Sequence, residues 1–176
     1  AFSVSRKGVW LTARHVAEGC TKTAIQTGRK KYVKIKKVIL HPEADVAILL
    51  TNGGPKELKL AKQMSASRDG FNVGFPTGQP GAVHARYIGE MTLRHINRQQ
   101  RRKGYRERVN AWAEQSRIPD RSGSLGGLSG GAVLDQQGQV IGIVQAEAAR
   151  RGRIMTARPA TIADMFRRAN ITYPSS

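Results

Sequence analysis

The feature that most constrains the fold is a succession of short apolar runs separated by turn residues. Each run is rich in Val, Ile, Leu or aromatic residues and is bounded by Gly, Pro, Asn or Asp, which is typical of a β-strand. Many short strands at close spacing favour a sandwich or a barrel over an alternating strand–helix fold. The predicted strands are residues 8–13, 23–27, 32–40, 45–50, 71–75, 82–91, 131–135 and 139–144.

One segment, residues 161–170, predicts a helix near the C-terminus. Thr161 and Asp164 have the spacing of a capping box, which would begin the helix. A stripe of apolar side chains follows at helical spacing, and we interpret it as a packing surface rather than a binding site. The stripe consists of Ile162, Met165, Phe166 and Ala169.

The charge of the chain is strongly positive. Lys and Arg number 30 and Asp and Glu number 12, giving a formal net charge of +18. This balance favours polyanionic neighbours such as an anionic polymer or a membrane surface, or else it only solubilises the protein. No specific nucleic-acid recognition motif accompanies the charge. Two runs concentrate it: residues 28–37, predicted as a solvated strand face, and residues 94–108, predicted as a protruding loop or long exposed hairpin.

The ends and the cysteine content set limits on location and redox chemistry. The sequence has no apolar run of membrane-spanning length and no visible signal peptide. It opens on a strand already under way, so we expect further residues upstream. Cys20 is the single cysteine, so no intrachain disulfide is expected, and we interpret it as a small buried thiol rather than a reactive one.

A glycine-rich stretch raises the question of function. Residues 123–133, GSLGGLSGGAV, contain five glycines and two serines. The stretch is either a flexible surface loop or a tight turn that presents Ser129. In the second case, the N–H groups of Gly127 and Ser129 would form an oxyanion hole.

A serine nucleophile needs a base, and the base needs a carboxylate. His15 follows a predicted strand directly and is the candidate base; taken by itself, it could equally be a structural or surface histidine. Asp45 enters an apolar strand, where a buried carboxylate requires a donor, and it is preferred to Glu43 in the preceding turn. Histidines in less suitable settings compete for the role of base: His41, His84 and His95. The order His, Asp, Ser is the order found in chymotrypsin-type enzymes.

At these residues the sequence resembles the chymotrypsin-like (trypsin-like) serine peptidases, in the bacterial group that also holds the HtrA proteases. LTARHV resembles the family motif around the base, and DVAILL resembles the motif around the carboxylate. GLSGGAVLDQQGQVIGIV resembles the segment around the nucleophile, and VGFPTG resembles the strand that begins the second barrel.

The resemblance implies an all-β fold of two antiparallel six-stranded barrels with a C-terminal helix. Residues 1–66 would form the barrel with the His and Asp, and residues 67–176 the barrel with the Ser and the helix. Ser129 would be the nucleophile, His15 the general base and then acid, and Asp45 the orienting carboxylate. Gly127 and Ser129 would supply the oxyanion N–H groups.

The expected function is therefore a serine endopeptidase that acts on protein or peptide substrates through an acyl-enzyme, without metal or cofactor. The alternative is a catalytically silent or latent module that binds polyanions or a protein partner through its basic face. The expected location is bacterial and extracytoplasmic, either periplasmic or membrane-anchored.

Departures from the trypsin pattern bear on activation and specificity. Leu128 and Gly123 stand where trypsin-type enzymes have the Asp that pairs with a new N-terminus and the Asp of the specificity pocket. By resemblance, Gln145, Ala146 and Glu147 would form the wall along which a substrate pairs. Three alternatives remain for Glu147: it meets a basic substrate side chain, it pairs with an arginine of its own loop, or it is simply exposed. The candidate arginines are Arg150, Arg151 and Arg153.

Overall fold

The computed structural model describes residues 1–18, 24–96, 104–120 and 122–174. Cys20 and the centre of the basic run 94–108 lie outside these residues. The elements, in chain order, are β1 (Phe2–Ser5), β2 (Val9–Thr12), α1 (Arg14–Ala17), β3 (Ala24–Gly28), β4 (Lys31–Leu40), β5 (Ala47–Thr51), β6 (Asp69–Gly74), η1 (Pro76–Gly78), β7 (Gly81–His95), β8 (Tyr105–Ile118), β9 (Ala132–Leu134), β10 (Val140–Ala148), η2 (Ala149–Arg151), β11 (Arg153–Thr156) and α2 (Pro159–Arg168). None of the described helices is long and apolar enough to cross a membrane.

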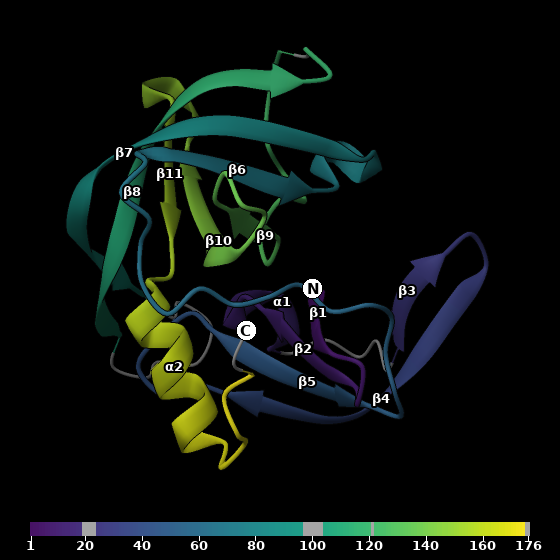
Figure 1. The fold of residues 1–176 in the computed structure, drawn as a ribbon. Helices are drawn as coiled ribbons and strands as arrows, with labels where there is room; N and C mark the ends of the chain where they lie inside the picture. Colours follow the sequence, from purple (N-terminus) through teal and green to yellow (C-terminus); the bar gives the residue numbers. More distant parts are fainter. Residues whose placement is uncertain (19–23, 97–103, 121, 175–176) are drawn as a thin grey trace.

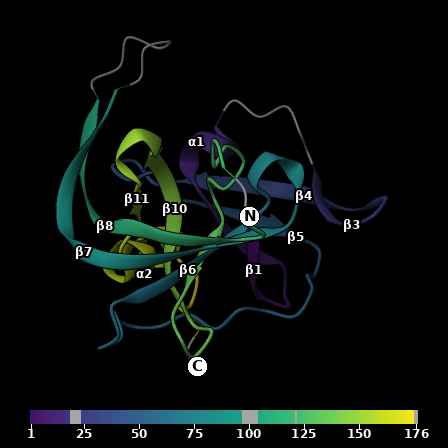
Figure 2. The same ribbon diagram turned by 90° about the horizontal axis from the view of Figure 1, so that it is seen from above.

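The first five strands form one open antiparallel sheet in the order β1-β2-β5-β4-β3. Its central strand β5 is almost continuously apolar because both of its edges are paired and its side chains are buried. The prediction of a closed six-stranded barrel here is wrong for the described residues. The hairpin of β3 and β4 projects away from the rest of the protein (Figures 1 and 2).

The remaining strands close into a six-stranded barrel in the order β10-β11-β8-β7-β6-β9. The strands β8 and β11 were absent from the sequence prediction. β8 pairs with β7 as far as His95 and Tyr105, so the described ends of the basic run 94–108 belong to a hairpin. Figures 1 and 2 both show β7 and β8 running side by side as a long curved ribbon.

The helix α2 packs on apolar surface shared by the open sheet and the barrel. Ile162, Met165 and Phe166 are buried in one cluster with residues of the open sheet, the barrel and the connecting segment. The helix is therefore part of the core that the two sheets share. The predicted apolar stripe is confirmed as packing surface. The predicted capping box does not form, because α2 begins at Pro159 and no side chain caps it.

The segment between β5 and β6 runs between the two sheets with hydrogen bonds to both. The N–H of Leu58 donates to the carbonyl of Ser3 at 2.9 Å. Leu60 then forms a parallel bridge with Val140 of β10. The open sheet and the barrel are thus joined by backbone pairing as well as by the shared core.

Candidate active site

His15 and Asp45 form a hydrogen-bonded pair on the open sheet. α1 begins where β2 ends, and it carries His15; Asp45 lies just before β5, which pairs with β2. The Nδ1 atom of His15 lies 2.6 Å from Oδ2 of Asp45, and the N–H of His15 donates to Oδ1 at 2.8 Å. The side chain of Asp45 is 5% exposed and that of His15 is 50% exposed. The carboxylate is therefore held at Nδ1, and Nε2 makes no hydrogen bond with any residue that the structure describes.

This contact changes the acid–base behaviour of His15. The hydrogen bond that His15 donates to Asp45 raises the pKa of His15, burial opposes this increase, and the charge of Asp45 adds to it. A carboxylate at Nδ1 also fixes the tautomer, so the neutral ring has its lone pair on Nε2. His15 therefore has the electronic arrangement of a general base.

The loop that carries Ser129 is attached to the barrel and lies against the start of α1. Gly130 donates its N–H to the carbonyl of Val144 on β10 at 2.7 Å, and Gly131 accepts from the N–H of Val144 at 2.9 Å. A Cβ added to Gly130 would lie 2.4 Å from Oγ1 of Thr12 and 3.1 Å from the nitrogen of Ala13. The residue after Ser129 therefore touches the chain just before His15.

The hydroxyl of Ser129 makes no hydrogen bond with His15 within the described part of the chain. Ser129 is half-buried. The structure thus brings the serine loop and the His15–Asp45 pair into the same region without joining them directly. Catalytic hydrogen bonds are commonly long or misaligned in the absence of substrate.

Two backbone N–H groups beside Ser129 are available to a ligand. The carbonyl of Gly126 accepts from the N–H of Thr77, and the carbonyl of Leu128 accepts from the N–H of Gly131. In a trans peptide the N–H points opposite to the carbonyl, so the N–H groups of Gly127 and Ser129 point away from these partners. Neither donates to another described residue. Gly127 has a φ of +94°, and a Cβ there would lie 2.7 Å from the carbonyl oxygen of Phe75.

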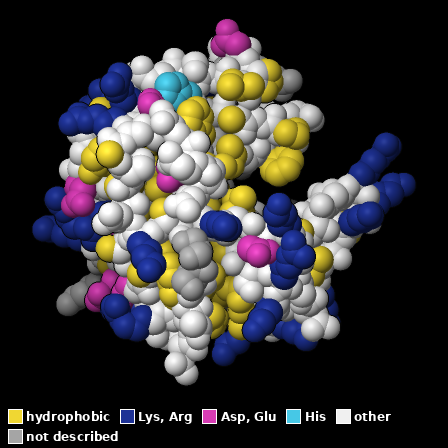
Figure 3. Space-filling model, in the orientation of Figure 1, with side chains coloured by type: hydrophobic (Ala, Val, Ile, Leu, Met, Phe, Trp, Pro, Cys, Tyr) yellow, Lys and Arg dark blue, Asp and Glu magenta, His cyan; other side chains and the backbone are white. Residues whose placement is uncertain are grey.

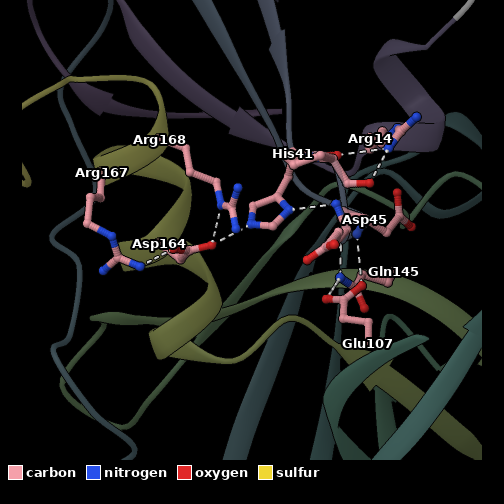
Figure 4. A network of polar contacts seen from close by, with 10 residues as sticks. Arg14, His41, Asp45, Glu107, Gln145, Asp164, Arg167 and Arg168 are labelled. Atoms are coloured by element: carbon pink, nitrogen blue, oxygen red, sulfur yellow. Dashed lines mark hydrogen bonds and ion pairs between the residues drawn. The ribbon is translucent and has the colours of Figure 1, made fainter. Parts of the chain in front are cut away.

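Buried polar groups of the barrel support Asp45 from behind, and sequence analysis assigned them no such role (Figure 4). The N–H of Asp45 donates to Oε1 of Glu107 at 2.8 Å. The amide of Gln145 donates to Oε2 of Glu107 at 2.8 Å and to the carbonyl of Asp45 at 3.2 Å. Glu107 lies in the basic run that was predicted as exposed. The signal that was available is that Glu107 shares the alternation of Val109 and Ala111, which face inward.

The residues predicted to bind substrate have mixed positions. Gly123 is exposed and accepts from Nη1 of Arg117 at 2.7 Å. The side chain of Gln145 is 3% exposed and donates to the carbonyl of Asp45 and to Glu107, so the predicted substrate contact at this position stays a prediction for its backbone alone. Ala146 is half-buried on β10. β9 pairs with β10 only as far as Ile143, so on that side Gln145–Ala148 pairs with no described strand.

Glu147 does not make the ion pair that was one of the alternatives for it; it binds a neighbouring loop instead. Its carboxylate accepts from the hydroxyl of Ser124 at 3.1 Å and from the N–H of Leu125 at 3.2 Å. It is half-buried, and it forms no ion pair with the arginines of its own loop in the part of the chain that the structure describes. Glu147 therefore fixes the loop that leads to Gly127 instead of neutralising its neighbours.

The other histidines have structural partners. Nε2 of His41 lies 2.7 Å from Asp164 on α2, His84 bonds to Asp69 at 2.8 Å, and Nε2 of His95 lies 3.0 Å from Glu107. Within the described ranges no group of His, Cys, Asp or Glu side chains is suited to hold a metal ion.

Comparison with known proteins defines the class. Residues 1–143, which include all three predicted catalytic residues, match the model of the trypsin-like peptidase domain. The chain belongs to this family. A comparison with curated protein sequences found no significant match.

Solved structures of peptidases share the fold. The active form of the Rv3671c protease from M. tuberculosis aligns with a TM-score of 0.78 and 23% identity over 99% of this chain and 74% of that chain. The MamO protease domain from Magnetospirillum magneticum aligns at 0.64 and 17% identity, covering 92% and 84% of the two chains. The HtrA-type protease AlgW, solved with a decapeptide, aligns at 0.61 and 22% identity, covering 92% and 47%.

Proposed function

We propose that this protein is a serine endopeptidase with His15, Asp45 and Ser129 as its catalytic residues. The observation that carries the proposal is the His15–Asp45 pair with its short Nδ1 contact. It lies beside a serine loop whose N–H groups at Gly127 and Ser129 donate to no residue in the described part of the chain. Membership of the trypsin-like peptidase family supports it.

The proposed mechanism follows from the atoms. The hydroxyl of Ser129 attacks the substrate carbonyl carbon while its proton passes to Nε2 of His15. The N–H groups of Gly127 and Ser129 stabilise the oxyanion. The C–N bond then breaks, His15 protonates the leaving amine, and an acyl-enzyme remains on Ser129. Water, deprotonated by His15, releases the acid and restores the serine. Asp45 stabilises the imidazolium in both halves.

The free strand edge of β10 supports binding of an extended peptide. Residues 145–148 expose backbone groups on one side, and an extended chain can pair there as an added strand. Glu147 and Gly123 border this edge and are proposed to influence the side chain accepted next to the cleaved bond.

Hydrolysis of a denatured protein and of a peptide library tests the proposal. We expect cleavage by the wild type, loss of cleavage in Ser129→Ala and His15→Ala, and no effect of chelators. If the folded wild type cleaves nothing, and its activity equals that of Ser129→Ala, the silent or latent module would be favoured instead.

A second candidate function, binding to an anionic membrane surface, is favoured by the β3–β4 hairpin. Residues 24–40 contain six Lys and Arg and no acidic residue. None of the six forms an ion pair with a described residue. Figure 3 shows Lys and Arg side chains on the visible face of the projecting hairpin. Tyr32 between them is 63% exposed, and an amphipathic ring suits a membrane interface. Membrane binding is compatible with peptidase activity outside the cytoplasm, and an extracytoplasmic location remains our proposal. The cations of this cationic arm are Arg29, Lys30, Lys31, Lys34, Lys36 and Lys37.

Vesicle binding tests the cationic arm. Each Lys or Arg near an anionic surface contributes about 1 kcal/mol, so replacing three of them by Gln is expected to weaken binding on the order of 100-fold. The arm variant is Arg29→Gln/Lys31→Gln/Lys34→Gln. The matched control is Arg150→Gln/Arg151→Gln/Arg153→Gln, which removes equal charge at η2 and the start of β11. Equal weakening by both, or no preference for phosphatidylglycerol over phosphatidylcholine vesicles, would contradict the role. Tighter binding to a single-stranded oligonucleotide would assign the arm to nucleic acid instead.

A further inference from the structure

The main chain of Asp45 is held on both of its sides by side chains from the other sheet. Its N–H donates to Glu107 of β8, and its carbonyl accepts from Gln145 of β10. Gln145 also donates to Glu107, which closes the three groups into one hydrogen-bonded ring. The ring joins the open sheet, which carries the His15–Asp45 pair, to the barrel, which carries Ser129.

The ring is fully enclosed. Asp45 is 3% exposed, Gln145 is 3% exposed and Glu107 is 4% exposed. Burying a carboxylate is costly unless donors surround it, and Glu107 receives the Asp45 N–H, the Gln145 amide and a contact from Nε2 of His95 at 3.0 Å. Two of these three donors, the Asp45 N–H and the Gln145 amide, belong to the ring. Glu107 therefore spends most of its hydrogen bonds on holding the ring together.

The same strand also holds the serine loop. Val144, the residue before Gln145, accepts the N–H of Gly130 at 2.7 Å and donates to Gly131 at 2.9 Å. Adjacent residues of β10 therefore hold Asp45 through a side chain and the neighbours of Ser129 through the backbone. The distance between the His15–Asp45 pair and the nucleophile depends on this short stretch of β10.

We propose that Glu107 and Gln145 are positioning residues that form a clamp between the sheets and fix the His15–Asp45 pair relative to Ser129. The proposal rests on the proposed peptidase function for its catalytic consequence. Neither residue touches a reacting atom. Their effect passes through the main chain of Asp45.

The number of donors and acceptors predicts that Glu107→Gln disrupts the clamp, although glutamine has nearly the same shape as glutamate. The glutamate presents two acceptor oxygens, one toward Asp45 and one toward Gln145. A glutamine presents one acceptor and one NH₂ donor, so either the Asp45 N–H or the Gln145 amide would meet another donor. Turning the amide of Gln145 relieves that clash but brings its oxygen against the carbonyl of Asp45.

Kinetics of three variants test the clamp. We expect Glu107→Gln to lower kcat by up to about 100-fold with little change in KM, because small misplacement of catalytic groups has effects of that size. Gln145→Met, which keeps the volume and removes the donor, is expected to lower kcat less, and the double variant less than the product of the two. The control is Thr156→Val, which removes the buried hydrogen bond from Trp112 to Thr156 elsewhere in the barrel. It is expected to lower stability and leave kcat unchanged.

A second measurement tests the clamp without depending on catalytic activity. The proton on Nδ1 of His15 is followed by NMR in wild type and variants. We expect its resonance to move and its exchange with solvent to accelerate in Glu107→Gln and Gln145→Met but not in Thr156→Val. Wild-type kcat together with an unchanged His15 resonance in both clamp variants would overturn the proposal. A wild type that neither cleaves nor labels would instead overturn the proposed function, and the NMR result alone would then decide on the clamp.

Discussion

At the scale of residues, the site rests on the contrast between a buried carboxylate and a half-exposed imidazole. Asp45 is almost fully enclosed, so its charge is compensated by fixed donors rather than by water. His15 remains open to solvent on its Nε2 side. Ser129 lies in a loop attached to the barrel, and Gly130 after it permits close contact with Thr12 and Ala13, just before His15.

The raised pKa of His15 predicts a particular pH dependence. The base must be neutral, so kcat/KM is expected to fall on the acid side at a pH above the ordinary histidine value of about 6.5. Asp45→Asn removes the cause, so the acid limb is expected to move to lower pH while kcat drops, by about 10⁴-fold for this kind of site. A pH profile of kcat/KM measures both effects. If the acid limb lies at the same pH in the wild type and in Asp45→Asn, Asp45 is not the cause of the raised pKa of His15.

The same shift has a consequence for stability. Because the folded pKa of His15 is raised, its pairing with Asp45 contributes fully at pH values below the unfolded pKa. That contribution is lost as pH rises through the folded pKa. Urea unfolding of wild type and His15→Ala should therefore differ more at pH 5 than at pH 9, whereas a constant difference would be inconsistent with the pair.

Gly127 provides a test of the oxyanion N–H groups. An alanine there would bring a Cβ within 2.7 Å of the Phe75 carbonyl at a φ of +94°, so the loop must shift. Loss of one oxyanion donor lowers kcat by about 10²–10³-fold. Gly138→Ala is the matched control: it has a φ of +75° and nothing within 4 Å of the added Cβ. It should have lower stability and normal kcat; equal kcat losses in both variants would exclude a specific role for Gly127.

At the scale of elements, the sequence predicted strands whose apolar runs are short and uninterrupted, and it missed others for physical reasons. β8 buries successive residues from Val109 to Trp112, so the alternation of one buried face is hidden. Its outer end carries arginines on the solvent side, which made it resemble a loop. β11 has only four residues and begins with an arginine. Its pairing with β8 and β10 is a long-range contact that local pattern does not encode.

The attachment of α2 to the open sheet makes an element-scale prediction. Asp164 accepts from the buried His41 and from Arg168, and these contacts lower its pKa to about 2, with Arg168 the larger cause. Asp164→Ala leaves the His41 N–H without an acceptor, which costs about 1–3 kcal/mol of unfolding free energy. The control Arg167→Gln alters a side chain that is 76% exposed and is expected to stay within about 0.5 kcal/mol. Urea titrations compare them, and equal midpoints would contradict a structural role for the His41–Asp164 contact.

The depressed pKa of Asp164 also fixes the pH range of that contribution. It is present above the unfolded pKa of about 4 and is lost as pH falls through about 2. The stability difference between wild type and Asp164→Ala should therefore shrink on acidification below pH 4. A difference that persists at pH 2 would show that the carboxylate charge is not its source.

At the scale of the whole molecule, an open sheet and a closed barrel share one core with the C-terminal helix. The candidate triad was predictable because its three motifs are local and occur in a characteristic order. The open edge of the first sheet was not predictable, because it depends on long-range strand pairing that local sequence pattern does not encode. The support behind Asp45 was missed for the same reason: Glu107 lies 62 residues away in the chain and meets it only after both sheets have formed.

The most direct test of the central claim is covalent labelling of the purified protein with a fluorophosphonate probe, with the modified residue located by peptide mass spectrometry. A fluorophosphonate reacts with a serine that an adjacent base has activated. We expect one label per chain, on Ser129, and we expect labelling to be lost in Ser129→Ala and in His15→Ala. A folded wild-type protein that takes up no label, or that is labelled equally well in His15→Ala, would contradict it.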